Sequence, residues 1–255
     1  MILDPGHGSE TAGMSATTGV SDGVGTIGIT YGTPEFRATF VVAEQVKGQL
    51  EVLDPTITAI ITKASANASI DNVTRARQLG DNNADIFISI HFDGFPRTGG
   101  AGARRTSAIV LPEMFEEMIG GVNFRTWNQN KQDEIDFAQD LIDSIVNNFF
   151  ITSGDAPADG GITSTGTNAN KGVLFETKPD GTWSTNAPWE ERLYHTTPST
   201  PASSRGLAVL FEVDNFKNPS VVDWLNNPDG SPFEPRYRTS ISNHIAQAIV
   251  NKLNE

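Results

Sequence analysis

The stretch ADIFISIH, residues 84–91, decides the fold of this chain. Its short apolar run is typical of a strand buried inside a sheet. The sequence DNVTRARQLGDNN (71–83) predicts a short helix before it, and ITAIIT (57–62) predicts a further buried strand before that helix. Because strands alternate with helices here, the sequence favours an α/β domain with a mostly parallel sheet.

Helix and strand signals continue on both sides of this stretch. Met1–Asp4 predicts the first strand, and TPEFRATFVVAEQVKGQL (33–50) predicts a helix with Thr33 as N-cap and Pro34 at its first position. The apolar residues of this helix follow its 3.6-residue period: Phe36, Phe40, Ala43, Val46 and Leu50. Further along the chain we expect strands at 108–111, 172–176 and 206–213 and helices at 131–149 and 240–253.

Length and composition agree with one α/β domain over residues 1–255. A chain of 255 residues can bury a sizeable core, yet the hydrophobic fraction is only 37% because small polar residues are abundant. We therefore expect a mostly parallel twisted sheet flanked by helices, with the polar residues concentrated in loops. Two stretches, at about 98–130 and 152–205, are much longer than ordinary connections and predict long loop insertions.

Charge and residue usage exclude several classes of function. The net charge of −13 argues against nucleic-acid binding through a basic surface and against adhesion to anionic membranes. The chain has no cysteine, which excludes disulfides, cysteine-ligated zinc and thiol nucleophiles. No apolar run reaches the roughly 18 residues that a membrane span needs. No signal peptide is visible before the first predicted strand, so we expect either a chain made in the cytoplasm or one whose leader has been removed. We expect a monomer.

Two histidines and two carboxylates are expected at one edge of the predicted sheet. His7, in the turn DPGHG, follows the first strand, His91 follows the strand at 84–90, and Glu212 lies near the end of the strand at 206–213. Glu35 lies in the first turn of the helix at 33–50. Ligands of open α/β sheets bind outside the carboxyl ends of the strands. Two His and one Glu with an open water position form the zinc site of several hydrolases, and a further carboxylate serves as general base.

Each of these residues also has an ordinary structural interpretation. A lone histidine after a strand is more often a loop or core residue, and an acid in a first turn complements the helix dipole. Glu212 is harder to dismiss, because an unpaired carboxylate within an apolar strand is costly. Glu44 competes with Glu35, although it lies about 13 Å further along the helix axis. His244 is expected to be structural, and His195 lies in the long polar segment, where it either has no special role or covers the site.

Four motifs resemble, in order and spacing, the zinc-dependent N-acetylmuramoyl-L-alanine amidase family of the amidase-3 type. They are ILDPGHG (2–8), Glu35 opening a helix, RARQLGDNNADIFISIH (75–91) and LAVLFEVDNFKNP (207–219). The resemblance implies that His7, Glu35 and His91 bind one Zn²⁺ ion and that Glu212 is the catalytic acid/base. Arg75 matches an arginine usual in the family, and we expect its role to be structural.

The resemblance also implies the substrate and the setting. It implies a single phosphorylase/hydrolase-like catalytic domain that cleaves the amide bond between N-acetylmuramic acid and L-alanine of peptidoglycan. The enzyme would act on the cell wall, in the periplasm, outside the cell or after release by a phage, as an autolysin or an endolysin. Two alternatives remain at this point: a zinc peptidase acting on wall peptides, and a catalytically inactive wall-binding module.

The insertions carry further hypotheses. Arg104 and Arg105 suit the carboxylates of a stem peptide, and Trp183 with Trp189 suits sugar faces, whereas solvated charge and local packing are the ordinary interpretation. The amphipathic stretch PEMFEEMIGG (112–121) is a candidate gate that an activator protein would move.

Overall fold

The structure is a computed structural model of residues 1–255. The part of the chain that it describes comprises residues 1–8, 35–70, 75, 78–79, 81–93, 106–110, 114–119, 122–127, 131–146, 173–175, 206–215 and 235–255. Thr33 and Pro34, the expected start of the first helix, lie outside these residues, as does most of the insertion at 152–205.

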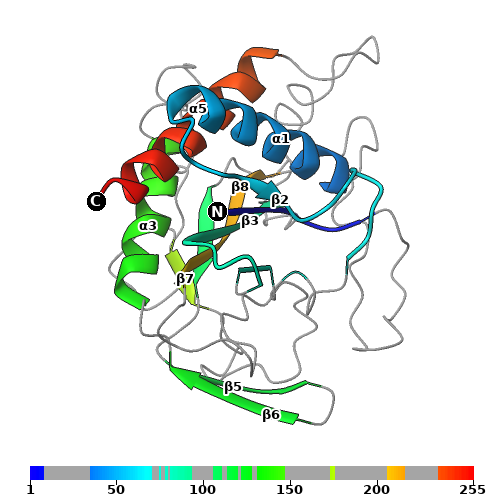
Figure 1. The fold of residues 1–255 in the computed structure, drawn as a ribbon, viewed down its shortest axis with the longest axis vertical. Helices are drawn as coiled ribbons and strands as arrows, with labels where there is room; N and C mark the ends of the chain where they lie inside the picture. The colour runs from blue at the N-terminus through cyan, green and yellow to red at the C-terminus, as the bar shows by residue number, and fades with distance from the viewer. Residues whose placement is uncertain are drawn as a thin grey trace, which may run out of the picture.

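A six-stranded mixed sheet forms the centre of the molecule (Figure 1). Its strands, in spatial order, are β2 (Ile60–Ile61), β1 (Ile2–Pro5), β3 (Ile86–Asp93), β8 (Leu207–Asn215), β4 (Ser107–Val110) and β7 (Val173–Phe175). Neighbouring strands run parallel except β4 and β8, which are antiparallel. The predicted α/β class with a mostly parallel sheet is therefore confirmed.

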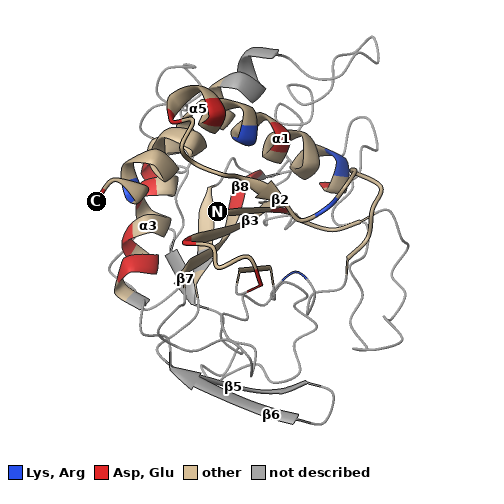
Figure 2. Ribbon diagram, viewed as in Figure 1, with Lys and Arg blue, Asp and Glu red and all other residues tan. Residues whose placement is uncertain are grey.

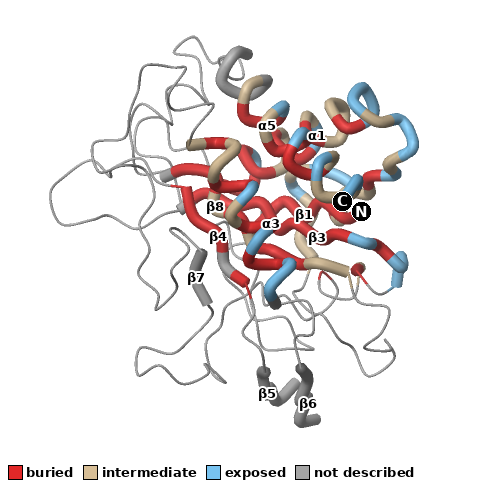
Figure 3. The backbone as a smooth tube through the Cα atoms, turned by 90° about the vertical axis from the view of Figure 1, so that its left-hand side faces the viewer, coloured by how far each residue is buried: buried red, intermediate tan, exposed pale blue. Residues whose placement is uncertain are grey.

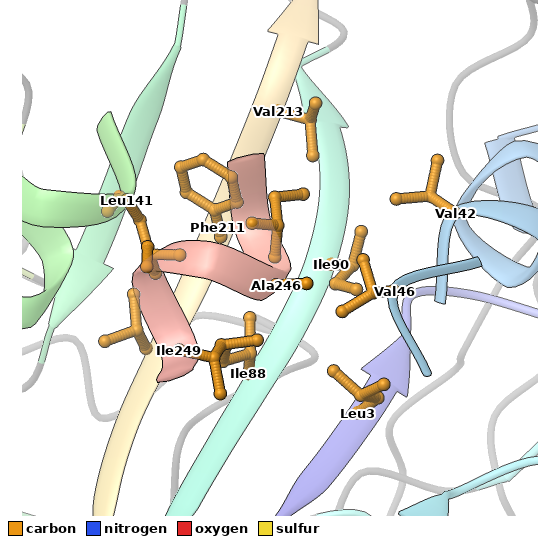
Figure 4. Close-up of a cluster of buried hydrophobic side chains, with 14 of the residues drawn as sticks. Leu3, Val42, Val46, Ile88, Ile90, Leu141, Phe211, Val213, Ala246 and Ile249 are labelled. Atoms are coloured by element: carbon orange, nitrogen blue, oxygen red, sulfur yellow. The ribbon is translucent and has the colours of Figure 1, made fainter. Parts of the chain in front are cut away.

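Three helices contribute to the main hydrophobic core: α1 (Glu35–Leu53), α3 (Lys131–Asp143) and α5 (Pro235–Leu253). Figure 4 shows side chains from all three helices facing residues of the strands, among them Leu3 and Ile90. The labelled helix residues are Val42 and Val46 of α1, Leu141 of α3, and Ala246 and Ile249 of α5. Burying each large aliphatic side chain stabilises the fold by about 1.5–3 kcal/mol. In Figure 3 the strands β1, β3, β4 and β8 are mostly buried. None of the helices in the described ranges is long and apolar enough to cross a membrane.

The other face of the sheet combines a small apolar cluster with polar side chains. Ile2, Phe87 and Ala208 are buried there together with Leu79 and Ala84. Because side chains alternate along a strand, Ser89 and His91 of β3 lie on the same face as Phe87. The polar end of this face lies at the carboxyl ends of β1 and β3, where the sequence places its candidate site.

Several elements differ from the sequence expectations. The strand expected at 57–62 is reduced to the half-buried pair Ile60–Ile61, because β2 is an edge strand with only β1 beside it. His91 lies within β3, not after it, because pairing with β8 continues through His91. The candidate gate at 112–121 includes β5 (Met114–Ile119), which pairs antiparallel with β6 (Val122–Trp127).

Helix ends also differ from the expectations. Within the helix expected at 131–149, residues Lys131–Asp143 are α-helical, residues 144–146 continue as a π-helical turn, and 147–149 lie outside the described residues. The helix expected from 240 begins at Pro235. Proline is well suited to a first helical position, so this earlier start has a local cause. Acidic side chains are prominent along α3 (Figure 2), in keeping with the net negative charge.

Candidate metal centre

The turn after β1 presents His7 in an unusual backbone conformation. The amide of Gly6 donates to the carbonyl of Ile90 on β3 at 2.9 Å, so the turn continues the β1–β3 pairing. His7 has a φ of 59°, in the left-handed region. This conformation costs a non-glycine residue about 1–2 kcal/mol. The surroundings of His7 must therefore hold it in place.

His91 packs directly against Gly6. A Cβ atom added to Gly6 would lie 2.2 Å from Cε1 and 2.4 Å from Nε2 of the His91 ring. No side chain other than hydrogen fits at position 6 while the imidazole keeps its place. The glycine of the DPGHG turn is thus required by the close approach of a second histidine from the neighbouring strand.

Glu35, the first residue of α1, lies between the two histidines. Its Oε1 is 3.2 Å from Nδ1 of His91 and 3.5 Å from Nε2 of His7, and it accepts a hydrogen bond from the Phe92 amide at 2.9 Å. The start of a helix also favours a carboxylate electrostatically. Burial acts to raise the pKa of Glu35, but the charges and hydrogen bonds of His7 and His91 outweigh it and hold the pKa well below its usual range.

Together these three residues could hold a metal ion. One ligand atom from each of His7, Glu35 and His91 lies within 4.8 Å of the others, and the two imidazole rings meet edge to face with centroids 4.8 Å apart. Glu35 and His91 are buried and His7 is half-buried. Two imidazole nitrogens and one carboxylate oxygen fit the donor preference of Zn²⁺, and three protein ligands leave a coordination position open.

Glu212 lies beside this group but is not part of it. It is the register partner of His91 on the parallel strand β8, and it is half-buried. Register partners on neighbouring strands project to the same face of the sheet. Ser107 of β4 is the register partner of Glu212 on its other side. A carboxyl group therefore stands next to a proposed ligand, on the same face of the sheet.

None of the other candidate residues that the structure describes, Glu44 and His244, joins the group of three. Glu44 is exposed on α1, so Glu35 is the carboxylate that meets the histidines. His244 is half-buried on α5, where burial lowers its pKa. The other five candidates lie outside the described residues: Arg104, Arg105, Trp183, Trp189 and His195.

A buried ionic cluster beneath the His7 turn was missed by sequence reasoning, except for Arg75. The Asp4 carboxylate accepts hydrogen bonds from Arg75 Nη1 at 2.7 Å and Ser89 Oγ at 3.0 Å, and from Thr62 Oγ1. Lys63 is buried beside it and donates to the turn. The sequence does contain a signal for this cluster, because Asp4 and Lys63 each stand at the carboxyl end of an apolar run, where parallel strands bring their ends together.

Comparison with known proteins agrees with this geometry. Residues 1–251 match the sequence model of the N-acetylmuramoyl-L-alanine amidase family. No curated protein matches the sequence.

Several solved structures share the fold. Ami1 of Mycobacterium abscessus has a TM-score of 0.63 and 19% identity, with 99% of this chain and 97% of that chain covered. An amidase of Clostridium difficile 630 has a TM-score of 0.61 and 16% identity, covering 100% and 96%. The catalytic domain of CwlV from Bacillus (Paenibacillus) polymyxa var. colistinus has a TM-score of 0.56 and 16% identity, covering 99% and 97%. The family match over nearly the whole chain is decisive: the protein belongs to the N-acetylmuramoyl-L-alanine amidases, enzymes that hydrolyse peptidoglycan.

Proposed function

We propose that this amidase uses one Zn²⁺ ion held by His7, Glu35 and His91. The observation that carries the proposal is the convergence of one donor atom from each of these residues within 4.8 Å. The three residues come from the turn after β1, the start of α1 and the strand β3, so the tertiary fold and not local sequence brings them together. The lowered pKa of Glu35 keeps this carboxyl ionised near neutral pH, as a metal ligand must be.

The bound ion would supply Lewis acidity, which polarises the scissile carbonyl and lowers the pKa of a water molecule. Glu212 acts as general base and then general acid. It takes one proton from the attacking water as the hydroxyl oxygen bonds to the lactyl carbonyl carbon. When the C–N bond breaks, Glu212 delivers this proton to the nitrogen of L-alanine, so that the products are a carboxylic acid and a free amine.

The position of Glu212 supports this division of roles. As the register partner of His91 it stands one strand away from a ligand, while it stays outside the group of three. A carboxyl on the same face as a proposed ligand, but outside the ligand set, would suit the role of general base. A wall-binding module without activity would have no use for such a group.

We further propose that residues 1–255 form one catalytic domain that acts on the cell wall as a monomer. The insertions at about 98–130 and 152–205, including Arg104, Arg105, Trp183 and Trp189, are proposed to contact the glycan and the stem peptide. A likeness to the CwlD amidase from Clostridioides difficile, solved in complex with the GerS lipoprotein, supports a search for an activator of this chain. That structure has a TM-score of 0.57 and 14% identity.

The direct test is digestion of purified peptidoglycan with and without a zinc chelator, with products identified by mass spectrometry. The proposal predicts stem peptides that begin with a free L-alanine amine, formed only while zinc is available and restored when zinc is added back. Undiminished release of these peptides by the chelated, metal-free enzyme would contradict the zinc proposal. Cleavage only inside the stem peptide would contradict the proposed substrate bond.

A further inference from the structure

The turn that carries His7 is held by two buried cationic side chains. Lys63, two residues after the end of β2, and Arg75, between β2 and β3, are each only 2% exposed. Nζ of Lys63 donates to the carbonyl oxygen of Gly6 at 3.1 Å and to that of His7. Arg75 donates from Nη1 to the Pro5 carbonyl and from Nη2 to the His7 carbonyl, each at 2.9 Å. Three successive carbonyl groups of one turn thus accept hydrogen bonds from two cations.

His7 needs support of this kind. Its φ of 59° is unfavourable for a residue with a Cβ atom, and such a conformation persists only where the surrounding structure holds it. The carbonyl of His7 belongs to the peptide group that follows its Cα atom. Fixing this carbonyl fixes the backbone at His7, and therefore the direction in which the imidazole points toward Glu35, 3.5 Å away.

The two cations have different further duties. Arg75 also pairs with the Asp4 carboxylate at 2.7 Å, so part of its role is to neutralise a buried acid. Lys63 donates to two carbonyl groups of the turn, those of Gly6 and His7, and it shares the His7 carbonyl with Arg75. Hydrogen bonds from a charged donor are roughly twice as strong as neutral ones, which suits a group that must hold a strained backbone.

We propose that Lys63 is a positioning residue for the metal ligand His7, acting together with Arg75 through the His7 carbonyl. This inference rests on the proposed zinc site. Groups that orient a metal ligand without touching the metal typically change metal affinity by about 10- to 100-fold when they are removed. Lys63 would therefore set zinc affinity from a position outside the ligand set.

The test compares Zn²⁺ affinity in Lys63→Met, Lys63→Arg and Thr62→Val. Lys63→Met keeps the length of the side chain but loses its charge and donors, whereas Lys63→Arg keeps both. Thr62→Val is the matched control, because Thr62 donates to Asp4 in the same cluster from the neighbouring position. Affinity is measured by competition with a chromogenic zinc chelator, at a temperature at which circular dichroism shows every variant folded. Should Lys63→Met not fold, Lys63→Gln takes its place; its shorter, uncharged side chain removes the charge-assisted hydrogen bonds, and we expect a loss of zinc affinity of at least about 10-fold.

For Lys63→Met we expect zinc affinity to fall by about 10- to 100-fold. Lys63→Arg should recover most of the lost affinity, and Thr62→Val should stay within about 3-fold of the wild-type affinity. Wild-type zinc affinity in folded Lys63→Met would overturn the inference and leave Lys63 a role in stability alone. If His7→Ala binds zinc as the wild type does, the zinc site itself is wrong, and the inference falls with it. These two failures are distinguishable because they occur in different variants.

Discussion

Substituting Gly6 by alanine should damage the metal centre without touching any proposed ligand. The added Cβ would lie 2.2–2.6 Å from three atoms of the His91 ring, whereas ordinary contacts begin near 3.4 Å. One of the two groups must therefore retreat by about 1 Å or more. The backbone of Gly6 has little freedom to do so, because its amide donates to Ile90 and its carbonyl accepts hydrogen bonds from Thr39 and Lys63.

The His91 ring is consequently the part that moves. Its Nδ1 is 3.2 Å from Glu35, so a shift of about 1 Å would disturb the arrangement of the donor atoms. A misplacement of this size at a reacting centre can cost about 100-fold in rate. We expect Gly6→Ala to lose at least 10-fold in zinc affinity and about 100-fold in peptidoglycan hydrolysis. Overpacking should also cost about 1–3 kcal/mol in the free energy of unfolding.

Gly48→Ala is the matched control for this substitution. Gly48 lies in α1, and a Cβ there would meet no heavy atom within 4 Å. Alanine in a helix interior is favoured over glycine by about 0.5–1 kcal/mol, so this variant should be slightly more stable and fully active. Zinc titration, dye release from labelled peptidoglycan and urea unfolding measure the three quantities. Wild-type zinc affinity and activity in Gly6→Ala would refute the steric argument.

Three further perturbations test other parts of the account. Glu212→Gln should fold and bind zinc with wild-type affinity but lose at least about 100-fold in turnover, because general acid–base catalysis contributes about 10²–10⁴-fold in rate. Near-wild-type turnover of this variant would remove Glu212 from the mechanism. Val46→Ala truncates a fully buried side chain of α1, so it should lower the free energy of unfolding, measured with urea, by about 1–3 kcal/mol. Val52 is exposed, so Val52→Ala should change the same quantity by less than about 0.5 kcal/mol. Burial lowers the pKa of His244, so the unfolded chain binds this proton more readily. Above pH 6.5, the ordinary pKa of histidine, His244 is neutral in both states and does not lower the free energy of unfolding; below that pH its preferential protonation in the unfolded chain destabilises the fold. His244→Gln should therefore make the free energy of unfolding of the metal-free protein less dependent on pH below 6.5.

The elements that position the centre could largely be predicted from the sequence. Strong apolar runs and helical periods identified β1, β3, β8 and most of α1, and parallel strands bring their carboxyl ends to one edge. The convergence of His7, Glu35 and His91 followed from this rule together with the family resemblance. Residue types alone left each of the three with an ordinary structural interpretation.

Other features depend on tertiary contacts that no local pattern records. The burial of Lys63 beneath the His7 turn requires β2 to pair with β1, although β2 is only two residues long. The antiparallel direction of β4 against β8 likewise depends on the path of the chain between distant elements. The antiparallel pairing of β5 with β6 does have a local signal in the sequence, because two glycines, at positions 120 and 121, stand between the two strands.

The central claim is tested most directly by anomalous X-ray diffraction at the zinc absorption edge from crystals of the zinc-loaded protein. We expect one anomalous peak within bonding distance, about 2.0–2.2 Å, of a nitrogen of His7, a nitrogen of His91 and a carboxylate oxygen of Glu35. The same peak should be absent from crystals of Glu35→Ala grown and soaked in the same way. A zinc ion bound elsewhere, with these three side chains in place and no peak between them, would contradict the account.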